Sequence, residues 1–215
     1  MSSTHSSRLS NSWGATHYPA VRKLVVERVG REWCLFLDRD GVMNRQVVGD
    51  YVRTWRDFEW LPRVPLALKM LREWAPRVVV VTNQQGIGKG LMSAGDVEAI
   101  HRSLRAELAA DNVLIDEFQV CPHLEALGCA CRKPKPALVL DWLKQHSDLE
   151  PSLSIMVGDS ECDLELANNV AAVSGGCSSV QIGRGTDQDA VADASFDTLW
   201  DFAVAVKQAR KEEGA

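Results

Sequence analysis

The sequence WCLFLDRDGVMN, residues 33–44, joins a short apolar run to two aspartates that stand two positions apart. The run over residues 33–38 is too short for a buried helix, which is typical of a strand covered on both faces of a sheet. Asp38 and Asp40 fall where this strand ends, just before Gly41. Ligands of α/β sheets bind beyond the carboxyl ends of the strands, so this pair is a candidate functional site.

Further apolar runs repeat this pattern along the chain. Alternating strands and helices predict right-handed crossovers and a doubly wound parallel sheet, a Rossmann-like α/β fold. The segment between Asn44 and Arg77 has room for one loop and one helix, so we expect no inserted cap domain there. Strands are predicted over residues 33–38, 77–82, 116–121, 154–159 and 179–183, and helices over residues 62–75, 93–110, 136–146, 161–171 and 197–212.

Length and composition limit the class of protein. The chain has 215 residues, of which 46% are hydrophobic and 25% are charged, as in ordinary globular proteins. We expect a flexible tail over residues 1–24 and a single domain over residues 25–215. The formal net charge of -5 argues against nucleic-acid binding, and no apolar run approaches the ~20 residues of a membrane span. The Ser-rich N-terminus lacks the apolar region of a secretory signal, so we expect a cytoplasmic protein.

Polar residues also follow the second and fourth predicted strands, as Thr82 with Asn83 and as Asp159. The carboxyl ends of parallel strands share one edge of the sheet, so these residues should converge with Asp38 and Asp40. An Asp-x-Asp pair alone is more often a turn or a helix cap. Several polar clusters at strand ends, in order, make that interpretation improbable.

In CPHLEALGCACRKPKP, residues 121–136, potential metal ligands directly precede two basic residues. Four residues are of the types that zinc prefers, namely Cys121, His123, Cys129 and Cys131. In a reducing compartment such clustering favours a metal over disulfides, although a chance cluster of reduced cysteines is the alternative. Four protein ligands leave no open position, so we expect a structural zinc that holds Arg132 and Lys133 over the site.

The segments DRDGVMN, VVVVTNQQGIGKG, CRKPKP and VGDSECD resemble the four motifs of the haloacid dehalogenase (HAD) phosphatases. The resemblance extends from about Cys34 to Gly185. The cysteine-histidine segment is similar to that of the capless members of subfamily IIIA, which act on heptose bisphosphate or histidinol phosphate. The resemblance implies an enzyme that depends on Mg²⁺ and hydrolyses phosphate monoesters through an aspartyl-phosphate.

The same resemblance implies a role for each motif residue. Asp38 would be the nucleophile and Asp40 the general acid and base, while Thr82 and Lys133 would stabilise the phosphoryl group. The Mg²⁺ ligands would be Asp38, the backbone carbonyl of Asp40, and Asp159. Asp163 would orient Lys133 or waters around the metal and not bind the metal directly.

The expected substrate is a small phosphorylated metabolite, first of all D-glycero-D-manno-heptose 1,7-bisphosphate. Histidinol phosphate is the alternative substrate, and a non-catalytic phosphate-binding protein is the alternative of another class. Ser160 stands where heptose-bisphosphate phosphatases often carry Lys, which weakens the substrate assignment but not the chemistry. Substrate binding is expected from Asn83, Arg132, Arg45 and Arg53, although scattered surface arginines are the alternative interpretation of the last two. The chain is expected to be a monomer that binds neither nucleic acid nor a membrane.

Overall fold

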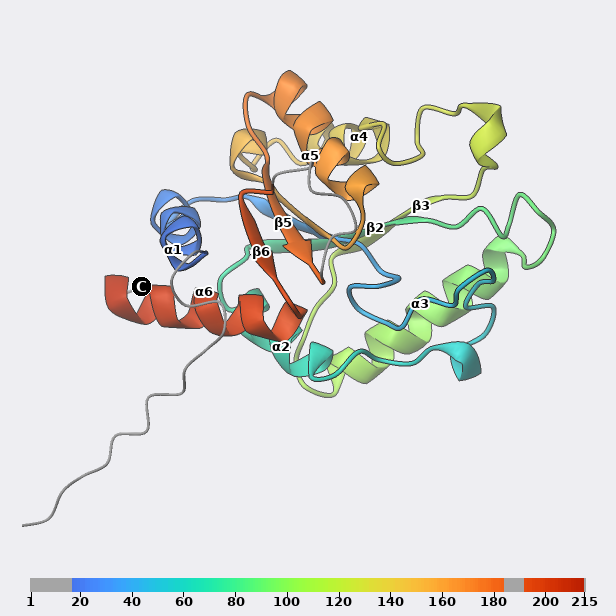
Figure 1. The fold of residues 1–215 in the computed structure, drawn as a ribbon, viewed down its shortest axis with the longest axis horizontal. Helices are drawn as coiled ribbons and strands as arrows, with labels where there is room; N and C mark the ends of the chain where they lie inside the picture. Colours follow the sequence, from blue (N-terminus) through green and yellow to red (C-terminus); the bar gives the residue numbers. More distant parts are fainter. Residues whose placement is uncertain (1–16, 184–191, 215) are drawn as a thin grey trace, which may run out of the picture.

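A computed structural model describes residues 17–183 and 192–214 and confirms the predicted α/β fold (Figure 1). Six parallel strands form one sheet in the order β3-β2-β1-β4-β5-β6. From β1 the chain proceeds to β2 and β3 on one side and then crosses to β4 on the other, so the winding direction changes between β1 and β4. The strands are β1 Cys34–Leu37, β2 Arg77–Asn83, β3 Glu117–Cys121, β4 Ile155–Gly158, β5 Ser178–Ile182 and β6 Ala194–Phe196.

Helices cover both faces of the sheet (Figure 1). They are α1 Tyr18–Glu27, α2 Val64–Arg72, α3 Ala94–Ala109, α4 Ala137–Gln145, α5 Glu161–Ser174 and α6 Leu199–Glu213. Between β1 and α2 the chain forms only a loop with one 3-10 turn, Trp55–Asp57, so the expectation that no cap domain is inserted there is confirmed.

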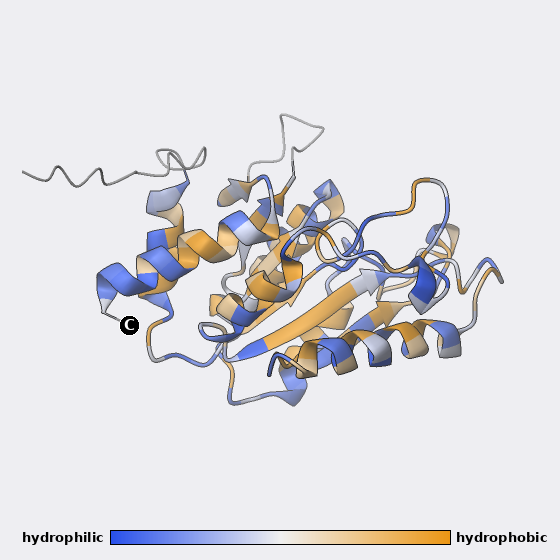
Figure 2. Cartoon of the chain, turned by 90° about the horizontal axis from the view of Figure 1, so that it is seen from below, coloured by the Kyte–Doolittle hydropathy of each residue, from blue (hydrophilic) through white to orange (hydrophobic). Residues whose placement is uncertain are grey.

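The alternation of side chains along the strands divides the core into two layers. Leu35, Leu37 and Val80 point into the layer that holds α1, α2, α3 and α6. Phe36 and Val79 point into the layer that holds α4 and α5. Successive strand residues face opposite sides of a sheet, so a strand buried on both faces must be apolar throughout. The apolar strands run through the interior in Figure 2, with polar residues on the outer sides of the helices.

Two elements escaped prediction from the sequence. Helix α1 falls largely within residues 1–24, so a packed helix stands where the sequence indicated only a tail. Val21, Leu24 and Val25 are buried against α6, and this burial fixes the segment. Strand β6 has only three residues and extends the sheet beyond β5. Residues 1–16 of the predicted tail, and Gly185 at the end of the motif region, lie outside the described residues.

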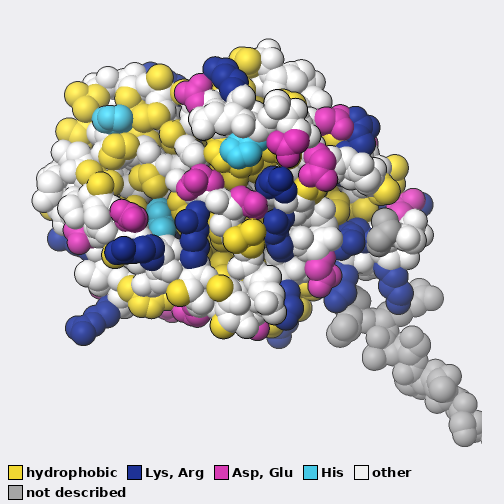
Figure 3. Space-filling model, turned by 180° about the vertical axis from the view of Figure 1, so that it is seen from behind, with side chains coloured by type: hydrophobic (Ala, Val, Ile, Leu, Met, Phe, Trp, Pro, Cys, Tyr) yellow, Lys and Arg dark blue, Asp and Glu magenta, His cyan; other side chains and the backbone are white. Residues whose placement is uncertain are grey.

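The surface carries charges of both signs. On the face shown in Figure 3, basic and acidic side chains are interspersed. None of the helices in the described part of the chain combines the length and the apolar character that crossing a membrane requires.

Leu24→Ala should lower the free energy of unfolding by about 2 kcal/mol or more, because it removes buried methyl groups between α1 and α6. The control is Val26→Ala on the same helix, where the side chain is 49% exposed and the expected change is within about 0.5 kcal/mol. Urea denaturation of both variants measures the difference. Equal stabilities for Leu24→Ala and the wild type would show that α1 is not part of the folded core.

Candidate active site

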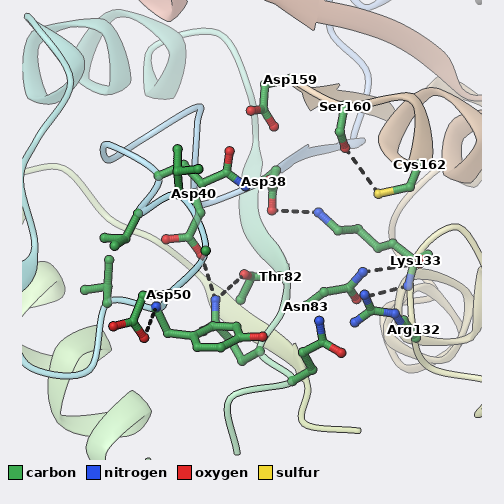
Figure 4. A pocket seen from close by; sticks show the side chains of 18 of the residues that line it. Asp38, Asp40, Asp50, Thr82, Asn83, Arg132, Lys133, Asp159, Ser160 and Cys162 are labelled. Atoms are coloured by element: carbon green, nitrogen blue, oxygen red, sulfur yellow. Dashed lines mark hydrogen bonds and ion pairs between the residues drawn. The ribbon is translucent and has the colours of Figure 1, made fainter. Parts of the chain in front are cut away.

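The predicted site residues meet at the carboxyl edge of the sheet, around the point where its winding changes direction. Asp38 directly follows β1, and its backbone N–H donates to the carbonyl of Val157 in β4 at 2.9 Å. Thr82 and Asn83 end β2, and Asp159 directly follows β4. Together with Asp40, Arg132 and Lys133 they line one cavity of about 490 Å³ (Figure 4). Strand ends distant in sequence thus supply one concave, polar site.

Lys133 is the centre of charge in this cavity. Its Nζ lies 2.6 Å from Asp38 Oδ1 and 2.6 Å from Asp163 Oδ1, and its side chain is only 3% exposed. Burial alone would lower the pKa of Lys133, but the carboxylates of Asp163 and Asp38 raise it above its ordinary value. Burial raises the pKa of Asp38 to about 8, against the opposing effect of Lys133. The ammonium is therefore kept charged beside the predicted nucleophile.

Backbone contacts hold Lys133 in place. Asn83 Nδ2 donates to the Lys133 carbonyl at 3.2 Å, and the Lys133 N–H donates to Asn83 Oδ1 at 3.1 Å. Asn169 Nδ2 on α5 donates to the carbonyl of Pro134 at 3.0 Å. Asn83 lines the cavity, but both polar atoms of its side chain bind the loop, so its visible contacts position Lys133 and not a ligand.

Asp163 joins Lys133 to the start of α5. Its Oδ2 accepts from Ser160 Oγ at 2.6 Å in a capping box, while its Oδ1 faces Lys133. A Cβ at Gly158 would lie 2.1 Å from Asp163 Cβ, so only glycine lets α5 begin this close to β4. Of the two expected roles of Asp163, this contact favours the orientation of Lys133. Ser160, which departs from the family pattern, serves as the N-cap of α5.

Three side chains donate hydrogen bonds to Asp40, two from the same turn after β1 and one from the segment after β2. Arg39 Nη2 donates to both of its carboxylate oxygens at 3.0 and 2.9 Å, Asn44 Nδ2 to Oδ1 at 2.9 Å, and Gln84 Nε2 to Oδ2 at 2.8 Å. Burial would raise the pKa of Asp40, but Arg39 and the hydrogen bonds bring it below its ordinary value. Gln84 Nε2 also donates to Thr82 Oγ1 at 2.8 Å, which leaves the Thr82 hydroxyl proton free for another acceptor.

Three neighbouring carboxyl groups in the cavity could hold a cation. One oxygen from each of Asp38, Asp159 and Asp163 lies within 4.8 Å of the others. Burial and then Asp163 raise the pKa of Asp159 to about 6. Gly41 has a φ of +95°, and a Cβ there would lie 1.9 Å from Asp159 Oδ2, so this glycine lets the carboxylate approach the turn after β1. Three close carboxylates, two of them buried, with one ammonium fit a hard divalent cation such as Mg²⁺.

The predicted cysteine-histidine cluster is assembled in the loop between β3 and α4. Sulfur atoms of Cys121, Cys129 and Cys131 lie 3.4 to 3.6 Å apart, and His123 Nδ1 lies 3.1 Å from Cys131 Sγ. A disulfide needs about 2.05 Å, whereas a tetrahedral ion with bonds of about 2.0–2.3 Å separates its ligands by roughly 3.3–3.8 Å. The loop therefore presents a site that can hold a metal, and the ligand types fit zinc.

Two of the predicted substrate ligands, Arg45 and Arg53, do not line the cavity. Arg45 pairs with Glu59 at 2.9 Å, and Arg53 pairs with Asp50 at 2.6 Å. Neither arginine is among the residues that line the cavity, so the geometry does not support their assignment as substrate ligands. Lys89 lines it instead, with its Nζ 5.3 Å from the centre of the Tyr51 ring.

Comparisons with known proteins agree with this geometry. D-glycero-alpha-D-manno-heptose-1,7-bisphosphate 7-phosphatases of Mycobacterium bovis and Mycobacterium tuberculosis are 68% identical to the chain over 191 residues, which cover 89% of it and all of each relative. The chain belongs to this family of HAD phosphatases. A D-glycero-beta-D-manno-heptose-1,7-bisphosphate 7-phosphatase of Rhodopseudomonas palustris is 37% identical over 139 residues, which cover 61% of the chain and 76% of the relative. No family model matches the chain.

A solved structure is also similar to this fold. The D,D-heptose 1,7-bisphosphate phosphatase of B. bronchiseptica, complexed with magnesium and phosphate, has a TM-score of 0.71 and 28% sequence identity. The match covers 82% of the chain and 98% of that protein. The chain is thus a phosphatase of the HAD superfamily that acts on phosphate monoesters, as the motifs predict.

The cysteine-histidine cluster should contain about one zinc per chain by elemental analysis of protein purified without chelators. Cys129→Ser should lower both the zinc content and the thermal midpoint, because metal binding orders the loop that carries Lys133. Cys177→Ser is the matched control, since Cys177 lies outside the cluster. Protein that contains neither zinc nor another metal in this loop would contradict the assignment.

Proposed function

We propose that the chain removes the 7-phosphate of D-glycero-α-D-manno-heptose 1,7-bisphosphate through an aspartyl-phosphate on Asp38. The observation that carries the proposal is the placement of Lys133 against Asp38 and of Asp40 beside the same cavity. The relatives at 68% identity are named for the α anomer and the one at 37% for the β anomer, which supports the choice of anomer.

The chemistry divides between the two aspartates. An Asp38 oxygen attacks phosphorus in line, and the bond from phosphorus to the sugar oxygen breaks. Asp40 gives that oxygen a proton, so it must enter this step protonated, although its donors Arg39, Asn44 and Gln84 favour the charged carboxylate. Asp40 then accepts a proton from the water that attacks the aspartyl-phosphate, which frees inorganic phosphate and restores Asp38. Lys133 neutralises the phosphoryl oxygens throughout, and the Thr82 hydroxyl is free to donate to one of them.

Mg²⁺ would be held by the carboxylates of Asp38 and Asp159 and by the backbone carbonyl of Asp40. When bound, it supplies positive charge that offsets the repulsion between the nucleophile and the phosphate. Both oxygens of Asp163 already have partners, Lys133 and Ser160, which supports a role in orienting Lys133. The fit rests on hard oxygen ligands and on the close approach that Gly41 permits.

We also propose that the cysteine-histidine cluster holds a structural zinc. All four ligand positions of a tetrahedral ion are filled by protein, so no position would be open for substrate. The cluster ends at Cys131, directly before Arg132 and Lys133, so an ion there would restrain the segment that carries both cations.

The second phosphate of the substrate would lie between Arg132 and Lys89. Arg132 Nη1 is buried and has no hydrogen-bond partner among the described residues, while its Nη2 lies 3.7 Å from Glu125. Lys89 lines the same cavity. Two cations beyond the reaction centre favour a bisphosphate over histidinol phosphate, which carries one phosphate and a positively charged amine.

A non-catalytic role is the weaker candidate, because each catalytic position is occupied by a suitable residue. The monomeric state, the cytoplasmic location and the absence of binding to nucleic acid or membrane stay predictions.

Asp38→Asn should abolish turnover of both the heptose bisphosphate and an aryl phosphate, because the amide cannot form the acyl-phosphate. Asp40→Asn should slow turnover of the bisphosphate by about 10²-fold or more. Steady-state phosphate release measures both, and circular dichroism verifies folding. Substantial turnover by purified Asp38→Asn would contradict the covalent mechanism.

The bisphosphate should exceed the matching 7-monophosphate in kcat/KM by about tenfold or more, since one charge-assisted contact contributes about 1.5–3 kcal/mol. Lys89→Ala and Arg132→Ala should each reduce this ratio more than they slow hydrolysis of an aryl phosphate. Arg45→Ala is the matched control and should leave the ratio unchanged. Equal kcat/KM for the two sugars, or a preference for histidinol phosphate, would contradict the substrate assignment.

A further inference from the structure

Arg39 is a buried cation with two partners on opposite sides. The side chain is 0% exposed, and its Nη2 donates to both oxygens of Asp40. Its Nη1 lies 3.2 Å from Nε2 of His101 on α3, a residue 62 positions away in the chain. Arg39 therefore links the proposed general acid and base to a helix that contributes no residue to the active cavity.

Chemistry fixes the direction of the contact between Arg39 and His101. A guanidinium has only N–H donors, so Nε2 of His101 must accept, and the imidazole must be neutral with its proton on Nδ1. Burial and then the charge of Arg39 lower the pKa of His101 to about 3, which agrees with a neutral ring. A charged imidazole would instead repel Arg39.

Packing holds the imidazole in this orientation. The ring stacks on Phe118 of β3, with centroids 4.1 Å apart and planes inclined by 15°. His101 is 6% exposed and lines a second hollow between α3 and β3, apart from the active cavity. It cannot reach the substrate from there, so any effect on catalysis must pass through Arg39.

We propose that His101 is a positioning residue that, through Arg39, aims the carboxyl group of Asp40 at the leaving oxygen of the substrate. Asn44 and Gln84 hold the two oxygens of Asp40 from other directions, and Arg39 bridges both. Without His101, Nη1 of Arg39 loses its hydrogen-bond partner. The guanidinium can then rotate together with the carboxyl group of Asp40. The inference rests on the proposed role of Asp40 as the group that protonates the leaving oxygen.

The test uses the dependence of the rate on the leaving group. A sugar alkoxide needs a proton as it departs, whereas p-nitrophenolate departs with little help, so only the sugar reaction depends strongly on a well-aimed acid. The constant kcat/KM reports the steps up to the departure of that group, before the aspartyl-phosphate is hydrolysed. A purely structural role of His101 would lower both reactions alike.

His101→Leu should lower kcat/KM for heptose bisphosphate by about tenfold or more and for p-nitrophenyl phosphate by less than about threefold. His101→Gln, whose amide oxygen can accept from Arg39, should recover most of the loss. Arg102→Gln, on the same helix and beside the same hollow, should leave both values unchanged. Equal losses on the two substrates, or no loss on either, would overturn the proposal.

A measurement on the wild-type chain is independent of how the variants fold. Nitrogen NMR of the His101 ring at neutral pH should show an unprotonated Nε2 and a protonated Nδ1. A proton on Nε2, or a charged ring, would overturn the proposal even if His101→Leu does not fold. Failure of the wild type to hydrolyse heptose bisphosphate, with p-nitrophenyl phosphate still cleaved, would instead overturn the proposed substrate.

Discussion

The contact of Lys133 with Asp38 and Asp163 is the interaction on which the site depends. Two buried carboxyl groups, those of Asp38 and Asp163, contact this one ammonium, and an oxygen of the partly buried Asp159 lies within 4.8 Å of theirs. Buried charges destabilise a fold unless they are paired, and one cation does not compensate three carboxylates. The same excess of negative charge that destabilises the site favours the binding of a divalent cation. With the cation bound, the negative charge is offset and a phosphate can bind.

Much of the chain around Lys133 holds it in position. Asn83 ties its backbone to the end of β2, Asp163 ties its ammonium to α5, and the cysteine-histidine cluster ends two residues before it. A flexible lysine would lose alignment with the transferring phosphoryl group, and displacements of about 1 Å can cost catalysis on the order of 10² in rate. Gly41 and Gly158 also help to form the site. Each glycine lets a carboxylate, Asp159 or Asp163, approach the backbone more closely than a side chain at that position would allow.

The sequence was sufficient to predict the fold class and most of the site, because strand ends and ligand spacing are local patterns. Asp38, Thr82 and Asp159 could be placed together because parallel strands end at one edge, whereas Lys133 was placed by the resemblance to the HAD motifs. Contacts between distant segments were not predictable in this way. Arg45 and Arg53 were predicted to bind substrate, but Glu59 and Asp50 pair with them, and composition does not reveal which exposed cations find such partners. Arg39 and His101 are 62 residues apart along the chain and meet only because α3 packs beside β3. Helix α1 was not predicted because its apolar stripe is short, and only the burial of this stripe against α6 shows that the segment belongs to the core.

The most direct test of the central claim measures the thermal midpoint of the wild type and of Asp159→Asn, each in buffer without Mg²⁺ and in Mg²⁺. Asp159→Asn removes one of the crowded negative charges and one proposed metal ligand. The account predicts that Mg²⁺ raises the midpoint of the wild type but not of the variant, and that without Mg²⁺ the variant is the more stable of the two. A variant that is less stable than the wild type without Mg²⁺ and still gains the full stabilisation from Mg²⁺ would contradict the claim that charge crowding around Lys133 creates the cation site.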